Sequence, residues 1–196
     1  MNKLFVPVLI FFLFSCNTGN NTDASSNNEQ NKSSLDFSRL WIEYFKDFRN
    51  AVYQNERKKV KELFEFPLLN EQNNIWYLAN ETVYEDTAIV AFTEKDFDNY
   101  YDKLFSKQFI NALLKVKSEL LYKNGEYETM EFSQGDTVKY KLIASFYCHD
   151  SILSLNFCTS SFATDENTDA YEFNIIYQFI IKKGQGMKFR QLFLAG

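Results

Sequence analysis

Residues 171–196, YEFNIIYQFIIKKGQGMKFRQLFLAG, contain two runs of alternating side chains with a short loop between them. Alternation with a period of two predicts β-strands that bury one face. The two predicted buried sets are Tyr171, Phe173, Ile175, Tyr177, Phe179 and Ile181, and then Met187, Phe189, Gln191, Phe193 and Ala195. Gly184 and Gly186 lie in the loop, where glycine readily adopts positive φ. The stretch therefore predicts a β-hairpin.

The register of this hairpin follows from the two sets. They meet when Phe179 faces Phe189 and Ile175 faces Phe193. A shift of one residue would turn one set to solvent, because side chains alternate between the two faces of a strand.

A second predicted hairpin precedes it. Its facing sets are Tyr140, Leu142, Ala144, Phe146 and Cys148 on one strand, and Leu153, Leu155 and Phe157 on the next. They match when Phe146 lies opposite Leu153 and the turn is centred on His149-Asp150.

This register also separates two cysteines. Cys158 lies opposite Lys141, seven residues from Cys148 along that strand. Seven residues span about 23 Å at about 3.3 Å each, whereas a disulfide requires Cα atoms within about 7 Å. We therefore expect no Cys148–Cys158 disulfide, although an oxidising compartment would permit one.

Helices are predicted ahead of the strands. Residues 35–53 carry apolar side chains at helical spacing. Asn55 is the predicted N-cap of a second short helix that ends at Pro67, the sequence at 93–96 resembles a capping box, and Ser106 caps a continuation of that helical region. Strands are predicted near 119–123, 127–132, 137–148, 152–162, 170–182 and 187–195, with one or two short ones between 68 and 92, best placed at 88–92. Helices followed by an antiparallel meander predict an α+β fold.

The N-terminus has the pattern of an export signal. Lys3 precedes an apolar run, Leu4–Phe14, that is too short to cross a bilayer. The run ends in Leu13-Phe14-Ser15-Cys16, which resembles a lipobox. The alternative is ordinary cleavage beside an incidental cysteine. We expect a lipoprotein signal peptide over 1–15 and lipid on Cys16.

Residues 17–34, NTGNNTDASSNNEQNKSS, have no apolar periodicity. With Cys16 they predict a lipidated, disordered tether over 16–34, followed by one domain over 35–196. By resemblance to lipoproteins, Asn rather than Asp at position 17 favours the outer membrane, with the domain facing the periplasm.

The formal net charge of the chain is −5, and no basic run is present. A protein without a basic patch has no electrostatic footprint for nucleic acid. The same charge gives no attraction to an anionic membrane surface. Membrane attachment is therefore expected to come from the lipid.

Three features together carry a resemblance: the aromatic first helix, the segment 55–66 that runs into Pro67-Leu68, and the ending 177–196. They resemble the nuclear transport factor 2-like (cystatin-like) superfamily. The resemblance implies N-terminal helices packed in the concave face of a curved antiparallel sheet, which together form a cone. That superfamily includes ketosteroid isomerase, scytalone dehydratase and many binding modules. No catalytic motif of either enzyme matches this chain.

The sequence offers few residues for chemistry. The only histidine stands in Cys148-His149-Asp150, and neighbouring side chains on a strand point to opposite faces, so these residues do not predict a triad. No Cys/His spacing fits zinc, and no glycine-rich loop fits phosphate. We therefore expect no catalytic residues, no cofactor and no metal.

Two polar pairs remain as candidate pocket residues. The predicted registers put Tyr177 opposite Gln191, and Tyr140 opposite Thr159. Each pair could satisfy its own hydrogen bonds in the core. Alternatively, the four side chains line a cavity in the cone and orient a ligand.

These observations predict a lipid-anchored envelope protein whose cone-like domain binds a small apolar ligand or a protein partner. The alternatives are an enzyme of isomerase or dehydratase type, which would need a buried acid with a shifted pKa, and a structural envelope accessory protein. An open cavity would favour a ligand, whereas a filled interior would favour a protein partner.

Overall fold

The computed structural model describes residues 28–69, 74–80, 90–133, 135, 138–161 and 171–196, with the backbone alone at 28–39 and 80. The helices are α1 (Asn28–Tyr53), α2 (Arg57–Lys61), α3 (Asn74–Asn80), α4 (Glu94–Leu104), α5 (Lys107–Leu114) and α6 (Ser118–Asn124). The strands are β1 (Glu126–Glu128), β2 (Phe132–Ser133), β3 (Val138–Tyr147), β4 (Ile152–Ser161), β5 (Glu172–Lys182) and β6 (Gly186–Ala195). This order confirms the predicted α+β class.

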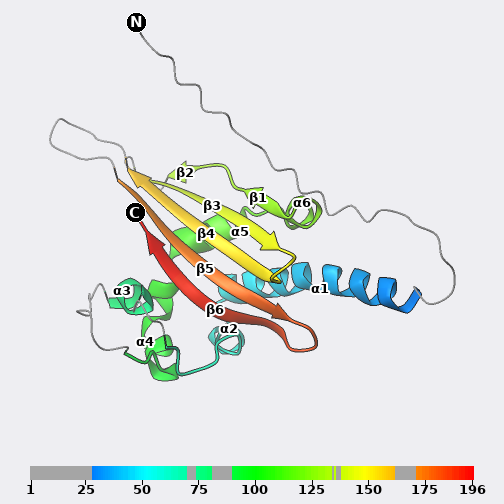
Figure 1. The fold of residues 1–196 in the computed structure, drawn as a ribbon. Helices are drawn as coiled ribbons and strands as arrows, with labels where there is room; N and C mark the ends of the chain where they lie inside the picture. Colours follow the sequence, from blue (N-terminus) through cyan, green and yellow to red (C-terminus); the bar gives the residue numbers. More distant parts are fainter. Residues whose placement is uncertain (1–27, 70–73, 81–89, 134, 136–137, 162–170) are drawn as a thin grey trace, which may run out of the picture.

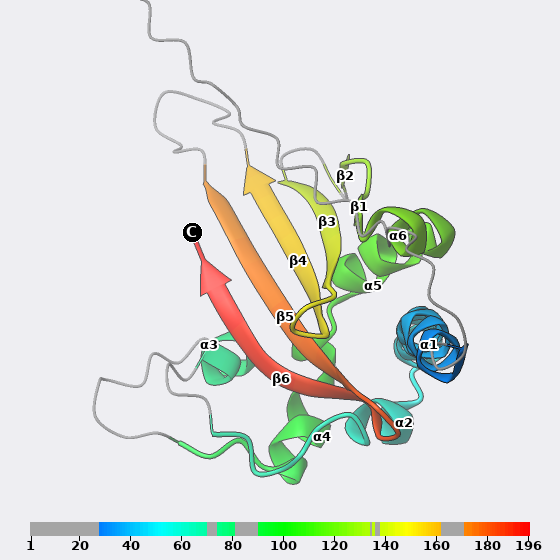
Figure 2. The same cartoon turned by 45° about the vertical axis from the view of Figure 1, so that its right-hand side comes forward.

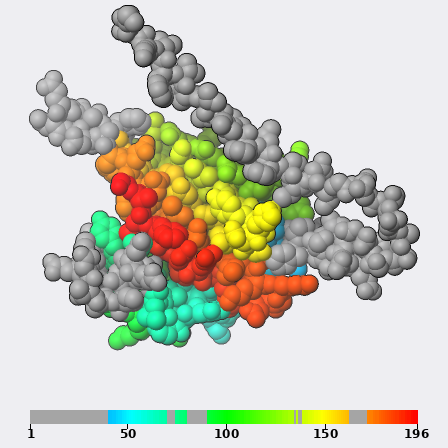
Figure 3. Space-filling view, viewed as in Figure 1, coloured from blue at the N-terminus to red at the C-terminus, as the bar shows by residue number. Residues whose placement is uncertain are grey.

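One antiparallel sheet runs through the molecule in the order β1-β3-β4-β5-β6, and β2 also pairs with β3 (Figure 1). Helices pack on one face, which we call the inner face. The Phe48 ring of α1 lies 4.9 Å from the Phe179 ring, and the Phe109 ring of α5 lies 5.7 Å from the Phe157 ring, between centroids. No described helix covers the opposite, open face, where strand atoms form the surface (Figures 1 and 3).

Helix α1 forms because its apolar residues recur every three or four positions. Trp41, Phe45, Phe48 and Val52 are all buried along one side of it. The Trp41 ring stacks on Phe146, with 4.2 Å between ring centroids, and so fixes the helix beside the end of β3. The helix begins at Asn28, within the stretch 16–34 that the sequence predicts as a tether.

The first hairpin has the predicted register. Phe146 pairs with Leu153, and Lys141 pairs with Cys158. Cys148 and Cys158 are not joined by a disulfide, as expected. Cys148 itself lies in the exposed turn after β3 rather than on the apolar face, which corrects that part of the prediction.

The last hairpin has the predicted register only beside its turn. Phe179 pairs with Phe189, but a β-bulge follows, because Gln178 pairs with Gln191 and leaves Arg190 without an opposite residue. The extra residue turns every later β6 side chain to the other face. Beyond the bulge, Tyr177 pairs with Leu192, Ile176 with Phe193 and Ile175 with Leu194. The predicted Ile175–Phe193 and Tyr177–Gln191 pairs were therefore wrong.

Two strand predictions were also wrong. The stretch expected as a strand at 119–123 is helix α6, whose buried residues Ser118 and Leu121 are three apart and which ends at Gly125 with φ +74°. The strand expected at 127–132 is two short strands, β1 and β2, that pair with different parts of β3.

Helix boundaries were partly predicted. Thr93 and Ser106 cap α4 and α5 as expected. Helix α2 begins after Glu56, while Asn55 has φ +55°, and α2 ends at Lys61, ahead of Pro67. Helix α3 was not predicted. Of the short strand expected at 88–92, residues 88 and 89 lie outside the described residues, and Phe92 forms a single bridge with Leu68.

Candidate functional site

Tyr177 belongs to the core rather than to a pocket. Its side chain is buried, and its ring lies between Phe105 and Phe109, with centroid distances of 6.1 and 4.7 Å. Its hydroxyl donates a hydrogen bond to the carbonyl of Leu104 at the end of α4. Burial raises the pKa of the Tyr177 hydroxyl. The hydroxyl therefore satisfies a helix-end carbonyl.

Gln191 lies on the open face, because of the bulge. Its Nε2 donates to Oε1 of Gln178 at 2.8 Å. Gln191 also lines a surface hollow of about 420 Å³ between β6, α3 and residues 65–69. The structure thus separates Gln191 from Tyr177 and gives each a different partner.

Tyr140 and Thr159 are brought together as predicted. They pair across β3 and β4, and both are half-buried. The Tyr140 ring stacks on Phe157 at 5.8 Å. Both residues line a hollow of about 280 Å³, where their strands meet Asn156 and Cys158. Because side chains alternate along a strand, Tyr140 and Thr159 point to the inner face with Phe157, whereas Lys141, Asn156 and Cys158 face the hollow.

Aromatic rings fill the interior between helices and sheet. Phe45, Phe92, Phe97, Phe109 and Phe179 are at most 1% exposed. Ring contacts link α1, the segment after α2, α4, α5 and the sheet through Phe48, Phe64, Phe97, Phe105, Phe109, Phe179 and Phe189. Packing of this kind leaves no polar centre inside the described core. Its ionisable groups are tyrosine hydroxyls.

Tyr101 is the second buried tyrosine. Its hydroxyl has no hydrogen-bond partner among the described residues, and desolvation raises its pKa to about 12. The Arg57 guanidinium lies 4.6 Å from the centre of its ring. A hydroxyl with so high a pKa stays protonated near neutrality, so it gives no general base.

Other buried polar groups have structural partners. Arg49 of α1 donates to the Val116 carbonyl at 3.1 Å and to Oγ of Ser118 at 3.0 Å. Desolvation lowers the pKa of Arg49. Oγ1 of Thr129 accepts from the Leu142 N–H at 2.9 Å. These bonds join the α5–α6 connection to α1, and the β1–β2 connection to β3.

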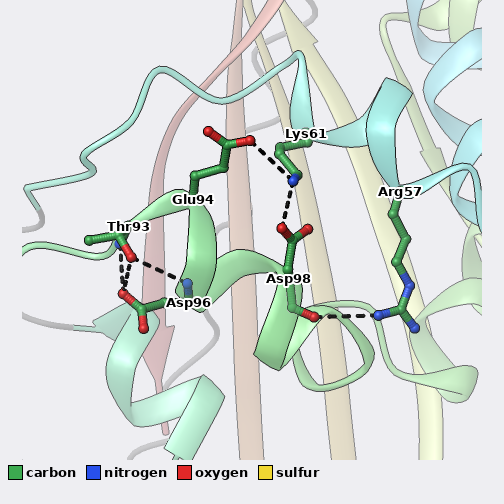
Figure 4. A network of polar contacts seen from close by, with 6 residues as sticks. All are labelled: Arg57, Lys61, Thr93, Glu94, Asp96 and Asp98. Carbon is green, nitrogen blue, oxygen red and sulfur yellow. Dashed lines mark hydrogen bonds and ion pairs between the residues drawn. The ribbon is translucent and has the colours of Figure 1, made fainter.

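A polar network joins α2 to α4 at the surface (Figure 4). Lys61 contacts Asp98 at 2.7 Å and Glu94 at 3.2 Å, and these contacts raise the pKa of its ammonium group. Arg57 reaches Asp102 at 2.9 Å. Each acid meets a cation from the neighbouring helix, so the network holds the two helices together rather than forming an acid–base site.

The open face carries four rows of side chains that run across β3, β4, β5 and β6. In that strand order, the first row is Tyr147, Ile152, Ile180 and Lys188, and the second is Ser145, Ser154, Gln178 and Gln191. The third row is Ile143, Asn156, Ile176 and Phe193, and the fourth is Lys141, Cys158, Asn174 and Ala195. Across these four strands the second and third rows hold no charged residue. The two rows continue into β1 at Glu126 and Glu128, and the exposed bulge residue Arg190 lies in β6 between the first and second rows.

The 280 Å³ hollow occupies the fourth-row end of this face. Oδ1 of Asn156 is buried there and has no hydrogen-bond partner among the described residues. Burial raises the pKa of the Cys158 thiol. Lys141 contacts Glu128 at 2.8 Å, which raises the pKa of its ammonium group. This end of the face therefore offers the Cys158 thiol, the Asn156 acceptor without a described partner, and a Lys141 charge that Glu128 neutralises. Such groups suit the binding of a molecule better than proton transfer.

His149 lies exposed in the β3–β4 turn. Within the part of the chain that is described, no three His, Cys, Asp or Glu side chains gather as metal ligands. None of the described helices is long and apolar enough to cross a membrane. Cys16 lies outside the described residues.

The open face was missed by the sequence reasoning, although a signal was present. Ile143, Ile152, Ile176 and Ile180 stand in the phase opposite to the predicted buried sets. Apolar residues in both phases of a strand indicate that both of its faces are apolar.

Comparison with known proteins gives no relative from which a role could be transferred. No protein-family model matches the chain, and neither a curated protein nor a solved structure matches it significantly. The functional argument therefore rests on the residues themselves.

Proposed function

We propose that the protein is a lipid-anchored, exported envelope protein whose folded domain binds a protein partner on the open face of its sheet. The observation that carries the proposal is the pair of uncharged rows across four neighbouring strands, with no described helix over them. Large uncharged faces rimmed by charges are typical of protein interaction surfaces.

The sequence supports the anchor. Lys3, the apolar run Leu4–Phe14 and the ending Ser15-Cys16 fit a lipoprotein signal. Two or more acyl chains would hold the domain durably at a membrane. We place it at the outer membrane, on the periplasmic side.

The helices on one face of an antiparallel sheet support the cystatin-like cone as the finer description of the fold. The filled interior favours a protein partner over a ligand inside that cone. A small apolar ligand is the second candidate, since Tyr140 and Thr159 line a hollow of about 280 Å³. An isomerase or dehydratase gains less support, because the described core offers tyrosine hydroxyls and no carboxylate.

The anchor is tested by Cys16→Ser in the full chain. The variant should lose the label after growth with a radioactive fatty acid and should leave the membrane fraction, because the acceptor thiol is gone. Cys148→Ser is the matched control and should keep the label. A labelled Cys16→Ser protein would contradict the anchor.

The open face is tested by Ile176→Arg, which puts a charge into the third row. Crosslinking in cells should trap a protein partner with the wild-type chain and at least tenfold less with the variant. Lys183→Glu, in the β5–β6 turn, is the control. Equal crosslinking of Ile176→Arg, with an unchanged circular dichroism spectrum, would show that the partner binds elsewhere.

A further inference from the structure

We infer that the occupant of the open face is a second copy of this chain, related by a two-fold axis that runs parallel to the strands between the two sheets. The inference rests on the proposed function of this face and names its partner.

Such an axis matches each row with itself. A half-turn about the strand direction lays β4 on β5 of the second copy and β3 on β6, while every row stays at its own height. Ile152 then meets Ile180, and Ser154 meets Gln178. At the edges, Ile143 meets Phe193. At these positions apolar side chains meet apolar ones and the polar second row meets itself, while Asn156 meets Ile176 in the third row.

The chemistry of the rows is self-complementary. Within one chain Ser145 donates to Glu126 and Gln191 donates to Gln178. Hydroxyl and amide groups both donate and accept, so the second row keeps further groups that can pair with the second row of the other copy. Lys188, whose ammonium group donates to the Glu62 carbonyl at 2.8 Å within one chain, ends the first row beside Tyr147 of the second copy, where a cation beside a ring is favourable. Lys141 meets Ala195. Within the four rows, the axis therefore brings no two like charges together.

Asn156 gives a second reason for a partner on this face. Its buried Oδ1 is unsatisfied within the described chain, and an unmet buried acceptor destabilises the folded chain. In the matched arrangement, the Gln178 amide of the second copy lies one row away. The amide reaches that acceptor when the Asn156 side chain turns toward the second copy, because the acceptor is shielded within one chain.

The face is large enough for a small specific interface. Four strands span about 20 Å, and four rows about 25 Å along them, at about 4.8 Å per strand and about 3.3 Å per residue. The flat area is about 500 Å² per copy, or about 1,000 Å² in total, which lies at the lower limit for a specific interface. Anchoring in one membrane would raise the effective concentration of the copies and so favour pairing.

The anchor also selects the axis. Trp41 of α1 stacks on Phe146 near the β3–β4 turn, and the Asn28 end of α1 projects past the hairpin turns (Figure 1). An axis along the strands points both α1 helices toward the same side. An axis across the strands would point them in opposite directions. The residues from Cys16 to Asn28 reach about 40 Å at most, which favours the arrangement with both anchors on one side.

Crosslinking between two full-length chains tests the arrangement. One tagged chain carries Ile143→Cys and a differently tagged chain carries Phe193→Cys, both with Cys148→Ser and Cys158→Ser. A short bismaleimide is the probe, because packed sheets lie about 10 Å apart. Co-expressed in cells, the pair should give a mixed dimer at least tenfold above either chain crosslinked to itself, since like positions lie at opposite edges.

Gln178→Arg in both chains should abolish the mixed dimer, because it sets two positive charges in the polar row, while circular dichroism stays unchanged. A crosslink between Ile143→Cys and Ser145→Cys chains in place of the first would overturn the strand-parallel axis. Crosslinks to another protein, without a mixed dimer, would contradict the inference that the partner is a second copy. They would still agree with the proposed function. The absence of any crosslink at these positions would contradict both.

Discussion

Tyr101 and Tyr177 are both 2% exposed, but their hydroxyls are in opposite states. The Tyr177 hydroxyl donates to the Leu104 carbonyl, whereas the Tyr101 hydroxyl has no partner in the described residues. A paired buried hydroxyl stabilises a fold modestly, and an unpaired one costs free energy. The two residues therefore form a matched pair for mutation.

We expect Tyr177→Phe to lower the free energy of unfolding by about 1–2 kcal/mol, because the Leu104 carbonyl loses its donor. Tyr101→Phe should leave it unchanged or raise it by about 1 kcal/mol, because only an unmet group is removed. Urea denaturation of the three proteins measures both. Equal losses in the two variants would show that the Tyr101 hydroxyl has a partner in solution.

The same hydroxyls predict alkaline sensitivity. The folded pKa of Tyr101 is raised to about 12 and that of Tyr177 is raised as well, from an unfolded value of about 10. Above about pH 10 the unfolded chain loses these protons first, so stability falls by up to about 1.4 kcal/mol per pH unit per tyrosine. Urea titrations between about pH 9 and 11 should show the decline, and the double phenylalanine variant should show less of it.

Among the elements, hairpins show how far alternation predicts structure. The β3–β4 register could be predicted because both strands keep an unbroken period of two. The β5–β6 register failed after Phe189, where Arg190 forms the bulge. The residues beyond the bulge, Leu192 and Phe193, are both apolar, so the sequence fits either phase. Which of Leu192 and Phe193 is buried depends on packing against the helices, and the alternation of the strand alone does not predict it.

Helix α6 failed for a different reason. Residues 118–124, SELLYKN, contain two adjacent leucines and a tyrosine, which suit a strand or one turn of helix equally well over so short a span. Packing decides for the helix, because Leu121 is buried while Leu120 and Tyr122 remain about 40% exposed. Among candidate site residues, Tyr140 and Thr159 were predictable for the same reason as the β3–β4 register.

The capping box of α4 gives a prediction for an element. Oγ1 of Thr93 accepts from the Asp96 N–H at 3.3 Å, and Oδ2 of Asp96 accepts from the Thr93 N–H at 2.9 Å (Figure 4). Thr93→Ala should lower the free energy of unfolding by about 1 kcal/mol. Thr93→Ser keeps the hydroxyl and should stay close to wild type. A loss as large in the serine variant would mean that the threonine methyl, not the cap, stabilises the helix.

The whole molecule has two sheet faces of different character. The inner face packs on helices through Leu142, Leu155 and Phe179, all fully buried. Figure 2 shows the sheet curving beside α1, α4, α5 and α6. The open face keeps apolar residues with no described helix over them. A single sheet with two apolar faces fits a module that buries the second face in an assembly.

Thiol reactivity reports on this second face in the intact protein. Cys148 lies in the exposed β3–β4 turn, and Cys158 lies half-buried in the fourth row of the open face. Burial raises the pKa of the Cys158 thiol, so less of it is the reactive thiolate at neutral pH. In membranes, a water-soluble maleimide should label Cys158 at least tenfold more slowly than Cys148, and equally fast in urea. Each is measured with the other changed to serine.

Part of the protection of the Cys158 thiol from maleimide comes from its own chain, and part would come from the second copy. Gln178→Arg, which separates the copies without touching either thiol, should therefore speed the labelling of Cys158 and leave that of Cys148 unchanged. If the Cys158 rate does not move, no second molecule covers the fourth row. If Cys158 reacts as fast as Cys148 in the wild-type chain, the partial burial of the Cys158 thiol in the fourth row is itself contradicted.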